Sequence, residues 1–206
     1  MTREALASLP LLGCGLTAAV TGARPLVWLT GAIAVVYVYC QARMLNAGRG
    51  VPAWRHPRLV PLLIVTGLAE GSGFGFLAQM LTEPAARPAW TAWLVMTLAF
   101  ARLVTFRMYY AGLANGGAPV RTQEVLGRFG RGFQAANAAA VVAAALGAVI
   151  ASGSGLVAVA ALICIAAGWW LKFTLVVRAA FNQGFALPKT PVRGSGFTHP
   201  GTRPGW

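Results

Sequence analysis

Long apolar runs dominate this sequence and restrict it to one class of fold. A helix needs roughly 20 mostly apolar residues to cross the hydrocarbon core of a bilayer, and six stretches have about that length. Because these runs are continuously apolar and show no alternation with polar residues, they predict helices and not the strands of a barrel. The predicted spans are residues 5–22, 25–43, 58–81, 88–110, 134–153 and 155–177.

The scarcity of charge supports the same conclusion. Of the 206 residues, 57% are hydrophobic and 10% are charged, whereas a soluble domain usually carries about 25% charged residues. The net charge of +13 would suit nucleic acid on a soluble scaffold, but these basic residues lie between apolar runs, so we exclude nucleic acid. We expect an all-α membrane protein with about six transmembrane helices in residues 1–178, followed by a Gly/Pro-rich cytoplasmic tail in residues 179–206.

The basic residues are concentrated in alternate connections between the spans, which predicts the orientation of the chain. An excess of Lys and Arg marks the cytoplasmic side of a membrane protein. The opposite connections contain only Arg24, Glu83 and Arg87. The basic connections and the tail contain Arg43, Arg49, Arg55, Arg58, Arg107, Arg121, Arg128, Arg131, Arg178, Lys189, Arg193 and Arg203. We therefore expect a multi-pass protein of the bacterial cytoplasmic (inner) membrane with both termini in the cytoplasm.

Some of these basic residues are candidates for docking a soluble partner. The tail also carries aromatic side chains, which are enriched in protein interfaces. The alternative is that the basic segments contact lipid headgroups or solvent, and the sequence leaves both interpretations open. The docking candidates are Arg121, Arg128, Arg131, Arg178 and Arg193.

Glu70 is the only acidic residue deep within a predicted span. A carboxylate at that depth is costly and by default marks a proton or ligand path. The alternative is a structural ion pair with a cation from a neighbouring helix, and Arg102 or Lys172 would supply that cation. Both interpretations stay open, because a buried ion pair can serve either purpose.

A second group of polar residues follows in the fourth predicted span, where Arg102, Arg107 and Tyr109 approach its expected cytoplasmic end. One interpretation is a polar pocket at the membrane boundary that holds a quinone headgroup. The other is that Arg107 extends to the interface and Tyr109 belongs to an aromatic belt. The candidates for a quinone site or proton path are Glu70, Arg102, Arg107, Tyr109 and Lys172.

Cysteine and histidine argue against a redox centre held by this chain alone. Cys14, Cys40 and Cys164 form no CxxC motif, and His56 and His199 lie outside the predicted spans. We therefore expect no metal site, no bis-histidine haem and no independent catalytic site. The residues before Cys14 are similar to a lipoprotein-processing site, but the leader is very short, so we expect this segment to remain the first span.

Two stretches resemble a known family. Residues 37–74, YVYCQARMLNAGRGVPAWRHPRLVPLLIVTGLAEGSGF, contain Tyr39, Trp54 and the sequence Leu-Ala-Glu-Gly around Glu70. They resemble the DmsC-type membrane anchors of dimethyl sulfoxide reductase-type enzymes, which are related to NrfD-type anchors. Residues 169–194, WWLKFTLVVRAAFNQGFALPKTPVRG, are similar to the membrane subunit of the phenylacetyl-CoA:acceptor oxidoreductase branch.

This resemblance implies a division of labour among subunits. A molybdopterin catalytic subunit would hold a molybdenum or tungsten bis-guanine-dinucleotide cofactor, and a ferredoxin-like subunit would hold iron–sulfur clusters. The membrane subunit would anchor both and exchange electrons with quinone, without a cofactor of its own. The family usually has about eight spans, and the two without a counterpart here would be N-terminal and include a histidine linked to quinol binding. Glu70 is the nearest match to an acidic family position.

Two other functions remain compatible with the sequence. The first is a small transporter or channel that uses Glu70 as a proton or cation relay, which the intramembrane acid and the small residues of the fifth span favour. The absence of an evident inverted repeat counts against it. The second is an assembly scaffold without an electron-transfer role.

Overall fold

The chain folds into long helices, as its apolar runs predict. A computed structural model describes residues 2–48, 50–82, 89–115, 118–150, 153–181, 190–191 and 200–201. The helices are α1 (Thr2–Thr21), α2 (Arg24–Ala47), α3 (Pro52–Arg55), α4 (Leu59–Thr82), α5 (Trp90–Asn115), α6 (Val120–Val149), α7 (Ser154–Phe173) and the π-helical turn η1 (Thr174–Arg178). The strands β1 (Thr190–Pro191) and β2 (Pro200–Gly201) pair antiparallel.

Within the described residues, five helical segments are long and apolar enough to cross a membrane. They are Arg24–Ala47, Leu59–Thr82, Ala89–Asn115, Val120–Val149 and Ser154–Arg178. The first predicted span also forms a helix. Its apolar part, Ala5–Thr21, is shorter than each of these five segments. The chain is therefore a multi-pass helical protein by length and composition, and the predicted count of six spans is not confirmed.

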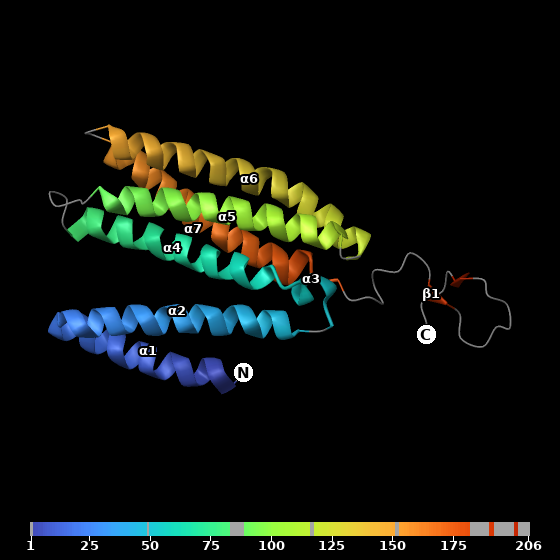
Figure 1. Cartoon of the computed structure of the whole chain (residues 1–206), viewed down its shortest axis with the longest axis horizontal. Helices are drawn as coiled ribbons and strands as arrows, with labels where there is room; N and C mark the ends of the chain where they lie inside the picture. The colour runs from blue at the N-terminus through green and yellow to red at the C-terminus, as the bar shows by residue number, and fades with distance from the viewer. Residues whose placement is uncertain are drawn as a thin grey trace.

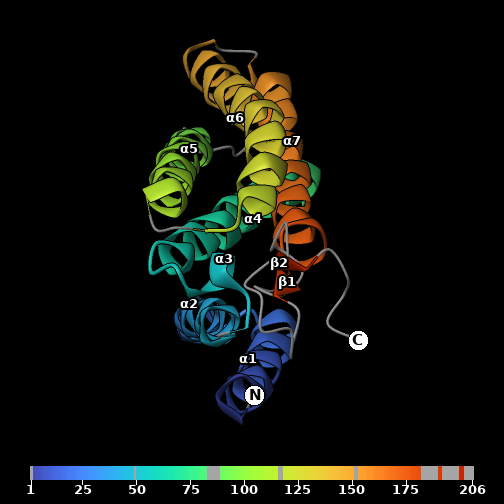
Figure 2. The same ribbon diagram turned by 90° about the vertical axis from the view of Figure 1, so that its right-hand side faces the viewer.

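Helices α4 to α7 form the body of the bundle, and α1 and α2 form a hairpin beside it (Figure 1). Around the body, α4 contacts α5, α5 contacts α6, α6 contacts α7, and α7 returns to α4. The end-on view shows the hairpin on one side of this body, with α2 nearer to it than α1 (Figure 2). Only 6% of the most apolar stretch of α2 is buried inside the structure. The corresponding share for the segment Ser154–Arg178, which contains α7 and η1, is 39%. The hairpin therefore buries little of its surface against the body.

Two apolar clusters fill the body, one at each end. The cluster near α3 contains large side chains, including Phe106, Tyr109, Phe129, Phe133 and Leu171. The cluster at the other end consists mainly of alanines, with Phe76, Val95, Val157 and Cys164. Small residues allow close approach of membrane helices, so α5, α6 and α7 pack tightly at the alanine-rich end. The two clusters meet near the middle of the bundle.

Helix α6 begins 14 residues before the predicted span, at Val120 instead of residue 134. Residues 120–133, which the sequence pattern assigned to the basic connection between the fourth and fifth spans, are therefore helical. The segment is amphipathic: Leu126, Phe129 and Phe133 are buried, whereas Arg128 and Arg131 are exposed. A hydropathy window averages over both faces and therefore misses a half-buried helix.

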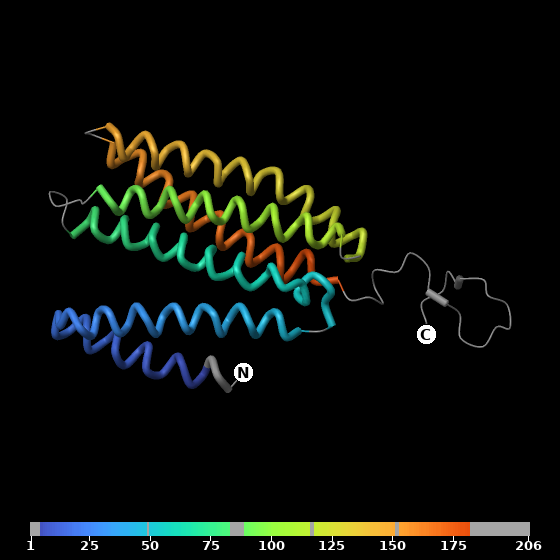
Figure 3. The backbone as a smooth tube through the Cα atoms, in the orientation of Figure 1, coloured from blue at the N-terminus to red at the C-terminus, as the bar shows by residue number. Residues whose placement is uncertain are grey.

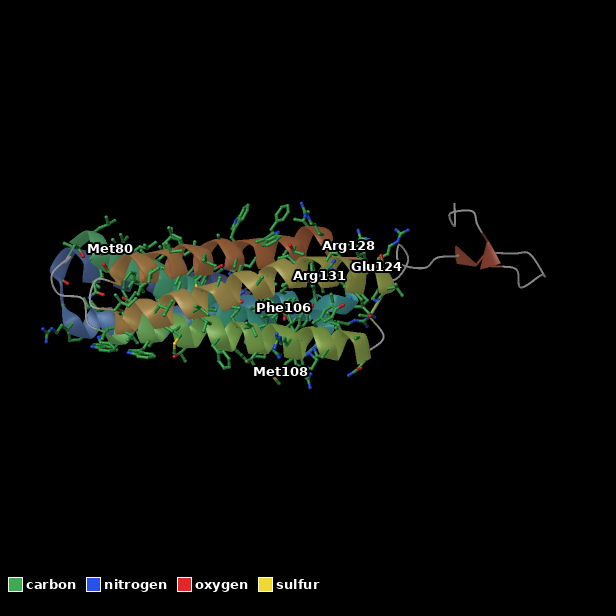
Figure 4. All side chains as sticks on the ribbon, turned by 90° about the horizontal axis from the view of Figure 1, so that it is seen from above. Met80, Phe106, Met108, Glu124, Arg128 and Arg131 are labelled. Atoms are coloured by element: carbon green, nitrogen blue, oxygen red, sulfur yellow. The ribbon has the colours of Figure 1, made fainter. Side chains whose placement is uncertain are left out.

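Most of the exposed arginines in the described residues gather at one end of the bundle, and Arg24 lies at the opposite end. Figure 4 shows Arg128, Arg131 and Glu124 near one end of α6 and Met80 near the opposite end of the molecule. The same end contains the end of α2, helix α3, the end of α5 and η1, as the backbone trace shows (Figure 3). The exposed arginines there are Arg43, Arg55, Arg58, Arg107, Arg121, Arg128, Arg131 and Arg178. We call this the basic end.

The short helix α3 closes the basic end of the bundle. Ala53 is fully buried, and its carbonyl accepts a hydrogen bond of 3.0 Å from the hydroxyl of Tyr109. The indole of Trp54 donates to the carbonyl of Leu175 at 3.1 Å. Leu175 lies in η1, the π-helical turn that follows α7. The α2–α4 connection is therefore fixed to α5 and to the end of α7.

Candidate functional site

Arg102 forms a polar layer between the two apolar clusters. Its side chain is fully buried, its Nε donates to Oδ1 of Asn137 at 2.6 Å, and its Nη1 donates to the carbonyl of Cys164 at 2.7 Å. Asn137 donates in turn to the carbonyl of Phe133 at 2.7 Å, and the guanidinium lies 5.6 Å from the centroid of the Phe133 ring. These contacts connect α5, α6 and α7 at mid-height. Nη2 of Arg102 has no hydrogen-bond partner.

Glu70 approaches the same level from α4. Its Oε2 forms an ion pair with Lys172 of α7, one of the two cations that the sequence offered, and this pairing is compatible with both interpretations of Glu70. The Glu70 side chain is 14% exposed and that of Lys172 is 45% exposed. Oε1 of Glu70 is buried and has no hydrogen-bond partner. The Glu70 carboxylate also acts electrostatically on the buried Arg102 guanidinium.

Gly168 makes room for the Glu70 carboxylate. It lies on α7 four residues from both Cys164 and Lys172, so all three share one face of that helix. A Cβ atom on Gly168 would overlap Oε1 of Glu70 and lie 2.7 Å from its Cγ and Cδ. The α4–α7 contact is therefore shaped around this carboxylate.

The variant Gly168→Ala is expected to displace the Glu70 carboxylate and to weaken its pairing with Lys172. Overpacking of this kind costs about 1–3 kcal/mol, more than the roughly 1 kcal/mol that alanine gains over glycine within a helix. The melting temperature of the detergent-solubilised protein, followed by circular dichroism, should fall. Gly155→Ala on the same helix is the matched control, since nothing lies within 4 Å of its Cβ position. A similar melting temperature for the two variants would contradict the prediction.

The ion pair lines a cavity that lies between α2, α4 and the end of α7. Its volume is about 430 Å³. Tyr37 and Gln41 of α2 also line the cavity. Apolar side chains form the rest of its wall: Val38, Ala42, Met44, Leu45, Leu63, Leu175 and Val176. An apolar pocket with a few convergent polar groups is the usual form of a small-molecule site. We call it the ion-pair pocket.

The structure does not bring the remaining sequence candidates into this pocket. Arg107 is exposed and donates to Oε1 of Gln134 at 2.8 Å. Tyr109 is fully buried below α3. Arg102 lies behind the ion pair and does not line the pocket. The docking candidates Arg121, Arg128, Arg131 and Arg178 are exposed at the basic end, and Arg193 lies outside the described residues.

Four residues at this site were not among the candidates that the sequence pattern offered: Asn137, Tyr37, Gln41 and Gly168. Asn137 is an amide before a long run of alanines in α6, and this polar residue at mid-span could have been recognised as a partner for Arg102. Tyr37, Gln41 and Gly168 carry no comparable signal, because their roles depend on which helices are neighbours. In the described part of the chain, no group of three or more His, Cys, Asp or Glu residues could hold a metal ion.

Comparisons with protein-family models, with curated proteins and with solved structures gave no match to this chain.

Proposed function

We propose that this chain is the membrane anchor and quinone-linked electron-transfer subunit of a multisubunit molybdopterin/iron–sulfur oxidoreductase of the dimethyl sulfoxide reductase superfamily. The observation that carries the proposal is the Glu70–Lys172 ion pair in the wall of an apolar cavity. The resemblance of residues 37–74 and 169–194 to DmsC-type anchors supports the proposed molybdopterin and iron–sulfur partner subunits. It also implies phenylacetyl-CoA as the substrate of the complex. The bacterial cytoplasmic membrane is the proposed location.

The ion-pair pocket suits the headgroup of a quinone. An ammonium group has three donors, so Lys172 can donate to a quinone oxygen while it stays paired with Glu70. Gln41 and Tyr37 add polar groups on the opposite wall, and the remaining lining accepts an apolar ring.

The proposed reaction needs electrons from outside this chain and protons within the pocket. Reduction of a quinone to a quinol consumes two electrons and two protons, and oxidation of the quinol releases them. The iron–sulfur clusters of the partner subunit would exchange the electrons. Glu70 is suitably located to exchange protons with a bound quinone, because a positioned carboxylate acts as a general acid or base within hydrogen-bond reach.

The basic end provides the proposed docking surface for the ferredoxin-like subunit. Helix α6 has 30 residues and is therefore about 45 Å long at 1.5 Å per residue, whereas the hydrocarbon core is about 30 Å thick. Part of α6 thus extends beyond the hydrocarbon core. Arg121, Arg128 and Arg131 are exposed on the first turns of α6, where an acidic partner surface could approach with electrostatic complementarity.

Purification in mild detergent through a tag on this chain tests the proposal. We expect two larger soluble subunits to accompany it, together with iron and with molybdenum or tungsten. The double variant Arg128→Glu/Arg131→Glu should reduce the yield of both partners at least tenfold, because it reverses charge on the docking surface. Arg24→Glu, at the opposite end, is the control. A metal-free chain that purifies alone or as a homo-oligomer would overturn the proposal and make transport through Glu70 the next assay.

A further inference from the structure

Two buried polar atoms on charged side chains have no hydrogen-bond partner within the described residues. One is Nη2 of Arg102, whose side chain is fully buried, and the other is Oε1 of Glu70. The guanidinium nitrogen is a donor, and the carboxylate oxygen is an acceptor. Buried polar atoms in proteins rarely lack a partner, because they have given up their hydrogen bonds to water. Both atoms therefore call for a partner of the opposite kind.

The two side chains approach the same turn of α7. Nη1 of Arg102 donates to the carbonyl of Cys164 at 2.7 Å, and Oε1 of Glu70 lies against the Cβ position of Gly168. A hydroxyl attached to Cβ in a helix can reach the carbonyl four residues earlier, so the Cβ position of Gly168 lies beside the carbonyl of Cys164. The guanidinium and the carboxylate are thus close to one carbonyl group. The electrostatic effect of Glu70 on Arg102 agrees with this proximity.

The chemistry of the two groups selects the molecule that fits between them. Nη2 of Arg102 and Oε1 of Glu70 are not hydrogen-bonded to each other, and polar groups separated by more than a direct hydrogen bond are commonly bridged by water. A cation in this place would be repelled by the guanidinium, and an anion would be repelled by the carboxylate. A water molecule can accept from the first group and donate to the second, and two polar partners are enough to hold it.

We propose that ordered water bridges Nη2 of Arg102 and Oε1 of Glu70. Arg102 is then a positioning residue for Glu70, because the bridge holds Oε1 on the α7 side and leaves Oε2 to pair with Lys172 at the wall of the ion-pair pocket. This inference does not rest on the proposed function. It concerns how α4, α5 and α7 share a polar contact in the interior of the bundle.

A structure of the purified protein, with any subunits that accompany it, tests the bridge at a resolution that shows ordered water. We expect a density peak at hydrogen-bond distance, about 3 Å, from both Nη2 of Arg102 and Oε1 of Glu70. A map that shows buried water elsewhere but no peak here would overturn the proposal. Direct contact between the guanidinium and the carboxylate would overturn it as well.

Two variants test the positioning role by the same measurement. Arg102→Met removes the donor, so the water peak should disappear and Oε1 of Glu70 should turn away from Gly168. Asn137→Leu is the matched control, because it removes another buried hydrogen bond of the same guanidinium and leaves Nη2 in place. It should keep both the peak and the carboxylate orientation. An unchanged carboxylate in Arg102→Met, or the same rotation in both variants, would overturn the positioning role.

Discussion

Replacing Arg102 with methionine is expected to lower the melting temperature of the protein by about 5–10 °C. Methionine keeps an unbranched apolar side chain but removes both hydrogen bonds of the guanidinium, those to Asn137 and to the carbonyl of Cys164. An unsatisfied buried polar group costs about 1–3 kcal/mol, and 1 kcal/mol corresponds to roughly 2–4 °C for a chain of this size. Circular dichroism of the detergent-solubilised protein measures the change.

The control and a second variant separate the lost hydrogen bonds from lost charge. Arg107→Met, on the same helix but exposed, should change the melting temperature by less than about 2 °C, because exposed substitutions usually lie within about 0.5 kcal/mol. The double variant Arg102→Met/Asn137→Leu should recover part of the loss, because replacing both partners of a buried hydrogen bond by apolar groups is nearly neutral. Equal melting temperatures for wild type and Arg102→Met would contradict this account.

Replacing Glu70 with glutamine is expected to lower quinone-linked electron transfer about 100-fold while the complex still assembles. Glutamine has nearly the same shape and keeps an acceptor, but it cannot exchange a proton at neutral pH and loses the charge that pairs with Lys172. General acid–base catalysis contributes typically 10²- to 10⁴-fold. The measurement is quinone reduction or quinol oxidation by the purified complex, together with the yield of the co-purified subunits.

Two further variants show whether the effect belongs to the ion-pair pocket. Glu124→Gln removes an exposed carboxylate at the basic end and should leave turnover unchanged. Lys172→Met should reduce turnover, and the double variant Glu70→Gln/Lys172→Met should lose less than the product of the two single effects, because the residues act on one ligand. If Glu70→Gln retained wild-type turnover, Glu70 would have no part in quinone chemistry.

Much of the architecture follows from local pattern. Continuous apolar runs force backbone hydrogen bonds to be satisfied within each segment, so the chain had to be helical in the regions that lipid surrounds. The basic residues were expected in alternate connections, and the structure brings those that it describes to one end of the bundle. Local pattern was less reliable at the ends of the helices. It did not include the first 14 residues of α6, whose apolar face is covered by the protein. It also predicted a first span in which the apolar part is short.

The pairing inside the bundle depended on tertiary packing. The sequence identified Glu70 as an intramembrane acid and left Arg102 and Lys172 as alternative partners. The structure pairs Glu70 with Lys172 because both lie at the contact of α4 with α7, where Gly168 admits the carboxylate. It directs Arg102 to Asn137, which lies 35 residues away on α6. Helical periodicity gives the direction of each side chain from its own helix axis, but it does not specify which helix lies opposite.

Cavities depend on tertiary packing in the same way: besides the ion-pair pocket, a groove of about 800 Å³ lies between α2, α4 and α5. Gly31 and Gly71 occur on separate helices, and each is compatible with tight packing or with open space. Only the arrangement of α2 beside α4 leaves open space there, on the α5 side of the contact between the two helices. The residue pattern therefore determined that this chain enters a membrane as helices. The contacts between helices decided where a ligand could bind, because a cavity is formed by neighbours that are distant in the sequence.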